Sequence, residues 1–478
     1  MNSALIQYYR CPPSTARFNL NGGTGISNGY FRFGESAICN GTLYGHPTSA
    51  NAGANLYDAA QAVEVKNQTI QLPFDPDEVA DTLRSERYVP DWRAPGTLSA
   101  LAQAYYSIRP LLPISIRRQL QKFHFKGWER RPFPHWPVDC SVDHLMQQLL
   151  LQAIRAGGAE RIPFIWFWPK SAPCCAIMTH DVETTLGRDF TPALMDIDDS
   201  FGIKASFQVI PEQRYIVSPD FLQSVRDRGF EIVVHDLNHD GHLYQDRKEF
   251  LERAVRINAY GRQYGAQGFR AGALYRKQVW YDALDFAFDM SVPNVAHLDP
   301  QPGGCCTVMP YFLGNILELP VTTSQDYTLF NILEQENTDL WQQQMSIIME
   351  NHGLMSFIAH PDYLETPQRV RVYRQLLEHL ARLRDESNVW IAKPGEVNSW
   401  WRKRAAMELV KQGNEWRVAG DGSDSACVAF AREEEGRLVF SLQSVSGDEV
   451  ELASASSAER LSLNHIQTSQ GIPQPLSV

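Results

Sequence analysis

Acidic, basic and histidine side chains in this sequence stand where short apolar runs end. Asp181 and Glu183 follow the run Cys175–Thr179, and His235 and His239 stand at the end of a later run and just beyond it. Parallel strands of an α/β barrel end at one rim, and reactive residues gather there. We therefore expect these four side chains to lie close together.

The spacing of His235 and His239 would place both imidazoles on one face if the chain turned helical after the strand. Glu183 would then complete a set of two histidines and one carboxylate, which leaves positions open for water and substrate, as in catalytic zinc sites. The two histidines alone fit a polar surface loop better than a metal site. The acids at a neighbouring strand end favour a divalent metal site, with zinc as the expected ion.

Asp181 and Glu183 flank Val182, so both carboxylates would point the same way while the strand persists. One could bind the ion while the other takes a proton from water whose pKa the ion has lowered. The alternative is that the acids only cap the next helix. Capping does not account for Arg270 and His360, which follow later apolar runs.

Arg270 could hold Asp181 by a charge-assisted hydrogen bond and keep that carboxylate ionised. His360 follows a strongly apolar run, and beside a metal site it is a natural general acid for the leaving group. Taken alone, each of these two residues also fits a structural role. We predict that both belong to the catalytic group.

The surrounding sequence, 163–404, alternates apolar runs with amphipathic segments of helical period. This alternation predicts a parallel α/β architecture, and seven or eight units favour a barrel. The expected strands are Cys175–Thr179, Ala205–Ile210, Glu231–His235, Gln267–Arg270, Phe288–Val292, Ile316–Val321, Met355–His360 and Val389–Ala392. The expected helices include Phe221–Arg228, Lys248–Tyr264, Thr338–Glu350 and Gln368–Arg384.

The remaining sequence divides by composition. We expect a β-rich region at 1–96, a helical connecting segment at 97–162, a small β module at 405–452 and a loose tail at 453–478. The formal net charge of −11 argues against a nucleic-acid partner. No apolar run approaches the length that a membrane-spanning helix needs.

The N-terminal residues lack a basic start and an apolar signal stretch, and the eight cysteines include no Cys-x-x-Cys pair. Both features favour a cytoplasmic protein with reduced thiols. The segment 109–131 is rich in Lys and Arg with interleaved apolar residues, so peripheral contact with an anionic membrane is one interpretation. A solvated helix packed on the barrel is the other, and we favour it.

The order Asp-x-Glu at 181–183, His-x-x-x-His at 235–239, Arg270 and a late His360 resembles the polysaccharide deacetylase superfamily over residues 165–400. The resemblance implies a distorted (β/α) barrel, a divalent metal that is usually zinc, and removal of an acyl group from an N- or O-acylated sugar. It implies a role for each matching residue: Asp181 as base, Glu183, His235 and His239 as metal ligands, Arg270 orienting the base, His360 as acid, and Asp289 supporting His360.

This sequence differs from the family pattern at three places. Glu183 replaces an aspartate, and Asp236 stands where Ser or Thr is usual. Arg270-Ala271-Gly272 lacks the usual proline and aromatic of a loop that normally offers a backbone N–H to the oxyanion. None of these changes removes a ligand, base or acid. We therefore expect a metal-dependent hydrolase that deacylates a carbohydrate with metal-bound water as nucleophile.

Two other functions fit the same motifs. One is an amidase that acts on a small or cyclic C–N substrate on the same scaffold. The other is a non-catalytic glycan-binding component of a polysaccharide-assembly system, which the altered third motif favours. The segment Thr322, Thr323, Gln325 and Asp326 follows another strand and is a candidate for lining the substrate cleft.

Overall fold

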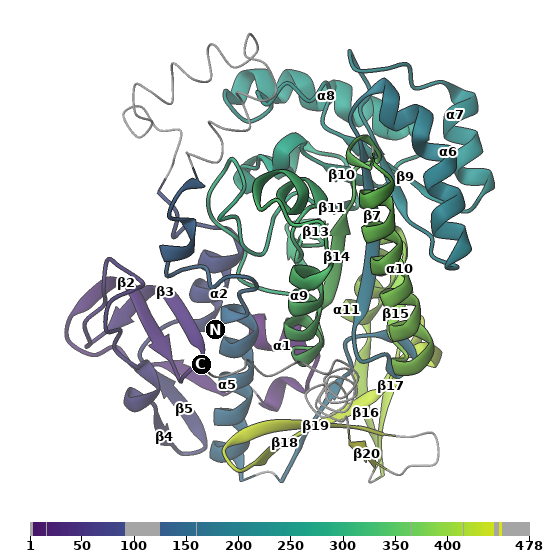
Figure 1. Cartoon of the computed structure of the whole chain (residues 1–478). Helices are drawn as coiled ribbons and strands as arrows, with labels where there is room; N and C mark the ends of the chain where they lie inside the picture. The colour runs from purple at the N-terminus through teal and green to yellow at the C-terminus, as the bar shows by residue number, and fades with distance from the viewer. Residues whose placement is uncertain are drawn as a thin grey trace, which may run out of the picture.

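The computed structural model describes residues 3–15, 17–90, 125–158, 160–364, 366–413, 415–443 and 449–451 (Figure 1). Most of the basic segment 109–131, the first part of the expected helical connecting segment at 97–162 and the expected loose tail at 453–478 lie outside the described residues. The membrane interpretation of the basic segment therefore stays a prediction.

A large, curled sheet forms the centre of the molecule. Its strands run in the order β12-β13-β11-β10-β9-β8-β7-β14, and β15 pairs with the start of β7. Every pairing in it is parallel except that of β12 with β13. The strands are β7 (Cys175–Val182), β8 (Ser206–Val209), β9 (Glu231–His235), β10 (Gly268–Arg270), β11 (Phe288–Asp289), β12 (Tyr311–Leu313), β13 (Ile316–Glu318), β14 (Leu354–Ile358) and β15 (Trp390–Ala392). Each expected strand is present, so the α/β prediction is confirmed.

The curled sheet is closed by side chains instead of a strand ladder. Beyond β13 the chain runs past β14, where the Thr322 hydroxyl donates to the Leu354 carbonyl at 2.7 Å and accepts from the Ser356 N–H at 2.9 Å. The Thr323 hydroxyl donates to the Ser356 carbonyl at 2.7 Å. We call these three contacts the threonine seam. They make the structure a distorted barrel, as predicted.

Amphipathic helices follow the strands and cover the outside of the sheet (Figure 1). Most begin at a side-chain cap: Thr184, Ser218, Asp246 and Thr366 each accept a backbone N–H of the first turn. The helices are α6 (Thr185–Ser200), α7 (Pro219–Asp227), α8 (Arg247–Tyr264), α9 (Asp339–Glu350), α10 (Pro367–Ser387) and α11 (Pro394–Ala406). Within the described ranges, none has both the length and the apolar character needed to cross a bilayer.

The N-terminal part mixes helices with strands. Helices α1 (Ser3–Tyr9) and α2 (Pro76–Arg84) accompany a sheet of order β1-β5-β4 and the hairpin β2–β3. Helix α5 (Ser141–Gly157) lies between these strands and the C-terminal ones (Figure 1). The strands are β1 (Phe18–Leu20), β2 (Ile26–Phe33), β3 (Ala37–Tyr44), β4 (Glu64–Lys66) and β5 (Thr69–Leu72).

The C-terminal strands pair with one that comes much earlier in the chain. Strand β18 (Val428–Glu434) pairs with β19 (Arg437–Gln443), as the alternating sequence predicts, and on its other edge with β6 (Ile162–Ile165). Strand β20 (Glu449–Glu451) extends this sheet, and β16 (Glu408–Gln412) and β17 (Glu415–Ala419) form a hairpin. One apolar core joins Tyr9, Phe31, Leu149, Phe164 and Phe440.

Arg404 links three segments of the chain by hydrogen bonds. It is fully buried in α11 and donates to the carbonyls of Ile165 at 2.7 Å, Trp166 at 2.9 Å and Tyr8 at 2.9 Å. Burial lowers the pKa of Arg404 to about 9. Helices α1 and α11 and strand β6 are thus joined through a single side chain.

Candidate metal and acid–base site

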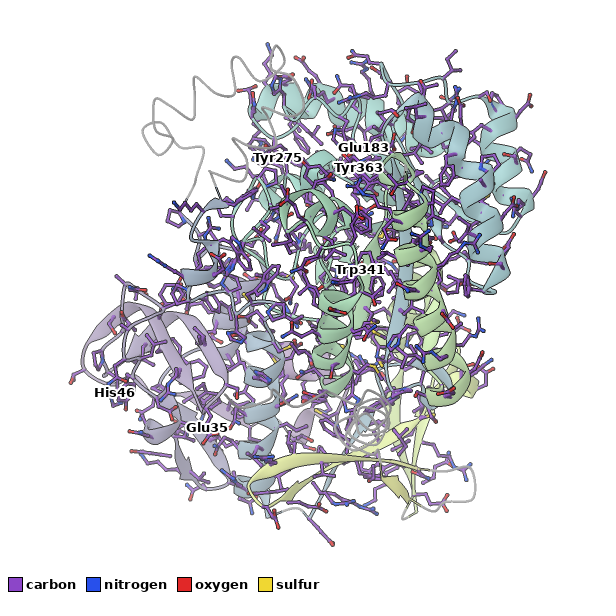
Figure 2. The ribbon with its side chains drawn as sticks, in the orientation of Figure 1. Glu35, His46, Glu183, Tyr275, Trp341 and Tyr363 are labelled. Carbon is purple, nitrogen blue, oxygen red and sulfur yellow. The ribbon has the colours of Figure 1, made fainter. Side chains whose placement is uncertain are left out.

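The carboxyl ends of four strands bring the candidate residues to one rim. Asp181 is the penultimate residue of β7, His235 ends β9 and Arg270 ends β10, where the two residues are register partners. His360 follows β14. Glu183 stands one residue beyond β7, near the upper end of that strand in Figure 2.

Glu183, His235 and His239 converge on one point. Each offers one ligand atom, and these atoms lie within 4.8 Å of one another. The Nε2 atom of His235 is buried and lacks a hydrogen-bond partner, which is unfavourable unless another group binds it. The Nε2 atom of His239 is also buried and lies 3.1 Å from Glu183 Oε1. The Nδ1 atom of His235 is 3.1 Å from the Arg270 carbonyl. A donor there leaves Nε2 with its lone pair, so the three side chains fit a divalent cation.

Charge supports the same conclusion. Burial lowers the pKa of His235, which keeps this imidazole neutral. Burial acts likewise on His239, but the Glu183 carboxylate, 3.1 Å from its Nε2 atom, raises the pKa of His239 above its usual value. Cation binding would replace the proton that this pair holds.

His239 reaches the site through a loop and not through the helical turn that the spacing suggested. Residues 236–242 are irregular, and both Asp236 (φ 57°) and His239 (φ 54°) adopt left-handed backbone conformations. The Arg214 guanidinium donates to the carbonyls of Asn238 at 3.1 Å and His239 at 2.6 Å. The spacing therefore brings the imidazoles together, with ring centres 5.0 Å apart, by a different backbone path.

Two of the sequence differences meet beside this loop. The Asp236 carboxylate accepts the N–H of Leu237 at 2.6 Å and that of Gly272 at 3.2 Å. A Cβ atom on Gly272 would lie 2.6 Å from Asp236 Oδ2 and 2.9 Å from His239 Cδ2. Glycine at 272 thus leaves room for both the aspartate and the histidine.

Asp181 pairs with Arg270. The guanidinium is fully buried, and its Nη1 atom lies 2.6 Å from Asp181 Oδ1 and 2.8 Å from the Thr179 hydroxyl. Burial alone would raise the pKa of Asp181, but Arg270, His235 and His360 hold that pKa below its usual value. The carboxylate is therefore ionised near neutral pH.

His360 is held by Asp326. Its Nδ1 atom is 2.6 Å from one oxygen of that carboxylate, and its backbone N–H donates to the other at 2.7 Å. The Nε2 atom lies 3.9 Å from Asp181 Oδ2 and 3.8 Å from Glu183 Oε1. Burial disfavours the charged imidazole, yet the carboxylates of Asp326, Glu183 and Asp181 raise the pKa of His360 to about 10.

Asp289 does not take the supporting place that the resemblance implied. It accepts the backbone N–H and the hydroxyl of Ser291 at 2.8 and 2.9 Å, and burial raises its pKa. Asp326 occupies the place beside His360 instead. From the sequence, Asp326 was predicted only to line the substrate cleft. It lies several residues beyond the end of β13, so the strand end does not determine where its side chain lies.

Sequence reasoning also missed the pair Asp362 and Tyr363. Asp362 accepts the backbone N–H of Glu183 at 2.9 Å, and the Tyr363 hydroxyl donates to Glu183 Oε2 at 3.1 Å. Figure 2 shows Tyr363 next to Glu183. The sequence feature that could have indicated both residues is their position shortly after His360, at the end of an apolar strand.

Comparison with known proteins yields matches among solved structures only. No protein-family model matches the sequence, and no curated protein matches it significantly. A presumed polysaccharide deacetylase from Mycobacterium smegmatis is 17% identical with a TM-score of 0.41, over 52% of this chain and 98% of that one. A family 4 acetyl xylan esterase from Clostridium thermocellum, in complex with cobalt, is 13% identical with a TM-score of 0.30, over 47% and 91%. A CE4 family pseudoenzyme from Bacillus anthracis is 14% identical with a TM-score of 0.32, over 48% and 66%.

Proposed function

We propose that this chain is a metal-dependent hydrolase that removes an acyl group, acetyl in the first instance, from an acylated carbohydrate. The observation that carries this proposal is the convergence of the buried Nε2 atoms of His235 and His239 on the carboxylate of Glu183, with His235 Nε2 left without a hydrogen-bond partner. Asp181, which pairs with Arg270, stands beside them. His360, whose ring is held by Asp326, also stands there. We name a carbohydrate as the substrate because the order of these residues along the chain resembles that of polysaccharide deacetylases.

A divalent ion held by Glu183, His235 and His239 would act as a Lewis acid that acidifies water and polarises an acyl carbonyl. The chain's own base is Asp181. Its Oδ1 atom is bound by Arg270, whereas Oδ2 faces the imidazoles of His235 and His360 at 3.7 and 3.9 Å. An ionised carboxylate with one oxygen free can take the proton of an attacking water.

The chain's own acid is His360. Its raised pKa keeps the imidazole protonated at neutral pH, and the Nε2–H points to the side of the site where Asp181 and Glu183 lie. Asp326 on Nδ1 fixes the ring and stabilises its positive charge. His360 can therefore donate a proton to the departing amine or alkoxide as the acyl bond breaks.

Metal analysis and product release test the proposal together. We expect about one divalent ion per purified chain and almost none after His235→Ala or His239→Ala, while His46→Ala, outside the site, keeps the ion. Wild-type protein should release acetate from at least one member of a panel of N- and O-acetylated oligosaccharides.

The outcomes separate the candidate functions. A wild-type protein that binds no divalent ion overturns the proposal. An ion-binding protein that releases nothing from the glycans but opens cyclic amides would be an amidase on this scaffold. An ion-binding protein that retains acetylated glycans without cleaving them would be a binding component.

A further inference from the structure

The two carboxylate oxygens of Glu183 have different partners. Oε1 lies 3.1 Å from His239 Nε2 and 3.8 Å from His360 Nε2. Oε2 accepts a hydrogen bond of 3.1 Å from the Tyr363 hydroxyl. One oxygen therefore faces the candidate metal site, and the other is bound by a neutral donor from the loop after β14.

The same loop also fixes the backbone of Glu183. Asp362 accepts the Glu183 N–H at 2.9 Å and the Thr184 hydroxyl. Gly187 allows this approach, since a Cβ atom there would collide with the Asp362 carboxylate. The backbone and the side chain of Glu183 are thus both held by Asp362 and Tyr363, which follow the proposed acid His360 after one proline.

The Tyr363 ring itself packs against two other rings. Its centre lies 4.8 Å from that of His360, with 51° between the ring planes, and 5.2 Å from that of Tyr327. A ring fixed in this way places its hydroxyl without further ordering. Glu183 has one more rotatable bond than the aspartate that the family pattern has at this position, so it gains most from such a fixed partner.

We propose that Tyr363 is a positioning residue that makes Glu183 offer a single oxygen, Oε1, to the divalent ion. This inference rests on the proposed function and refines its metal site. With Oε2 engaged by the hydroxyl, the protein supplies three donor atoms, one from each of Glu183, His235 and His239. An ion held by these three donor atoms would keep an open position for water or substrate, which catalytic sites require.

Cobalt binding to Tyr363→Phe tests this inference. Cobalt(II) reports its own coordination, because four-coordinate sites absorb visible light more strongly than five-coordinate ones. Without the hydroxyl, Oε2 is free to join the ion. We expect weaker visible absorption and an affinity about tenfold lower, as is typical when a hydrogen bond to a ligand is lost. Tyr327→Phe removes a hydroxyl from the adjacent ring and should change neither quantity.

Three measurements keep the outcomes separate. The melting temperature of metal-free Tyr363→Phe should stay within a few degrees of wild type, which shows that the ring alone maintains the fold. Wild-type protein without cobalt binding would reject the proposed function. Wild-type protein that binds cobalt, with Tyr363→Phe identical in spectrum and affinity, would reject the role of Tyr363 alone.

Discussion

Asp181 is a buried carboxylate with one oxygen fixed and the other open. Arg270 binds its Oδ1 atom and supplies the charge that offsets burial, while Oδ2 stays open toward the imidazoles of His235 and His360. Breaking a buried pair of this kind by removing the carboxylate would leave an unpaired guanidinium. A substitution that keeps the shape but removes the charge is therefore the cleaner probe.

Asp181→Asn should abolish turnover without releasing the ion. An amide cannot accept the proton of water, so we expect kcat to fall by about 10²–10⁴. Acetate release and metal content, measured on the same preparation, check this. Asp385→Asn, at an exposed residue paired with Arg384, is the control and should keep full activity. Activity of the Asp181 variant within a few fold of wild type would assign the base elsewhere.

Gly272→Ala should disturb the loop 236–242, which carries the proposed metal ligand His239. The new Cβ atom would lie 2.6 Å from Asp236 Oδ2 and 2.9 Å from His239 Cδ2, so one of these groups must move. We expect an affinity for cobalt about tenfold lower and a free energy of unfolding lower by about 1–3 kcal/mol. Titration with cobalt and urea unfolding measure the two effects.

Gly157→Ala is the matched control for that experiment, because its Cβ atom would meet nothing within 4 Å. It should leave the affinity for cobalt unchanged. If both alanine variants bind cobalt equally well, the contact between Gly272 and His239 does not position the ligand.

The sequence predicted the positions of those site residues that lie at the ends of strands. Asp181, His235 and Arg270 lie within or at the end of parallel strands, and the common rim brings such residues together from sequence order alone. Asp326 and Tyr363 reach the site from loops. Loop paths depend on contacts between distant residues, so no local pattern places them.

At the scale of elements, the threonine seam replaces the last ladder of the barrel. Hydroxyl groups of Thr322 and Thr323 satisfy the backbone of β14 where no strand pairs with it. Both side chains are buried, so loss of the hydroxyls would leave peptide groups of Leu354 and Ser356 without partners.

The double variant Thr322→Val and Thr323→Val should lower the free energy of unfolding by about 2–4 kcal/mol, since each buried peptide group that loses its partner costs about 1–3 kcal/mol. Valine keeps the volume, so packing changes little. Urea unfolding followed by circular dichroism measures the change. Thr69→Val, in β5 and away from the seam, is the control; equal effects of the two variants would contradict the role of the hydroxyls.

Glu231 gives strand β9 a pH-dependent contact with α11. Its carboxylate accepts the Gly395 N–H at 2.9 Å, and burial raises the pKa of Glu231 to about 7. In the unfolded chain the pKa of a glutamate is about 4.3. The folded state therefore binds the proton more tightly, and the stability that Glu231 adds is complete below about pH 4 and lost as the pH rises through 7.

Glu231→Gln should remove this pH dependence. Between pH 5 and pH 8 we expect wild type to lose about 1–3 kcal/mol of unfolding free energy relative to the variant. Urea unfolding of both proteins at both pH values measures the difference. Glu408→Gln, at an exposed position, should follow wild type. A difference between wild type and Glu231→Gln that stays constant with pH would exclude titration of this carboxyl.

The central strands were predictable because nearly every residue in them is buried. All eight residues of Cys175–Val182 are buried, and such an apolar run between helical segments has few other interpretations. The N-terminal region was harder. It was expected to be mixed and β-rich, and α1 was not placed in it because Ser3–Tyr9 is too short to show a helical period and packs against α5.

At the scale of the whole molecule, one apolar core joins helix α1 near the N-terminus to strand β19. Tyr9, Leu149, Phe164 and Phe440 belong to this core, and Arg404 binds the carbonyls of α1 and β6 beneath it. The 405–452 strands therefore do not have a core of their own.

Arg404→Met should destabilise the whole protein and not one part of it. Three segments lose a buried charged donor, so we expect a loss of about 3 kcal/mol or more and a single unfolding transition at lower temperature. Calorimetry measures both. Arg417→Met, at an exposed residue of β17, is the control. Separate melting of the C-terminal strands would contradict the shared core.

The pairing of β6 with β18 has a practical consequence for anyone who trims this protein. A shortened chain that keeps only 163–404 would lose α1 and the strand β18 that pairs with β6, so an edge of β6 would stand unpaired and part of the shared apolar core would face water. Such a fragment is expected to aggregate, and its silence in an enzyme assay would say nothing about the chemistry of the intact chain.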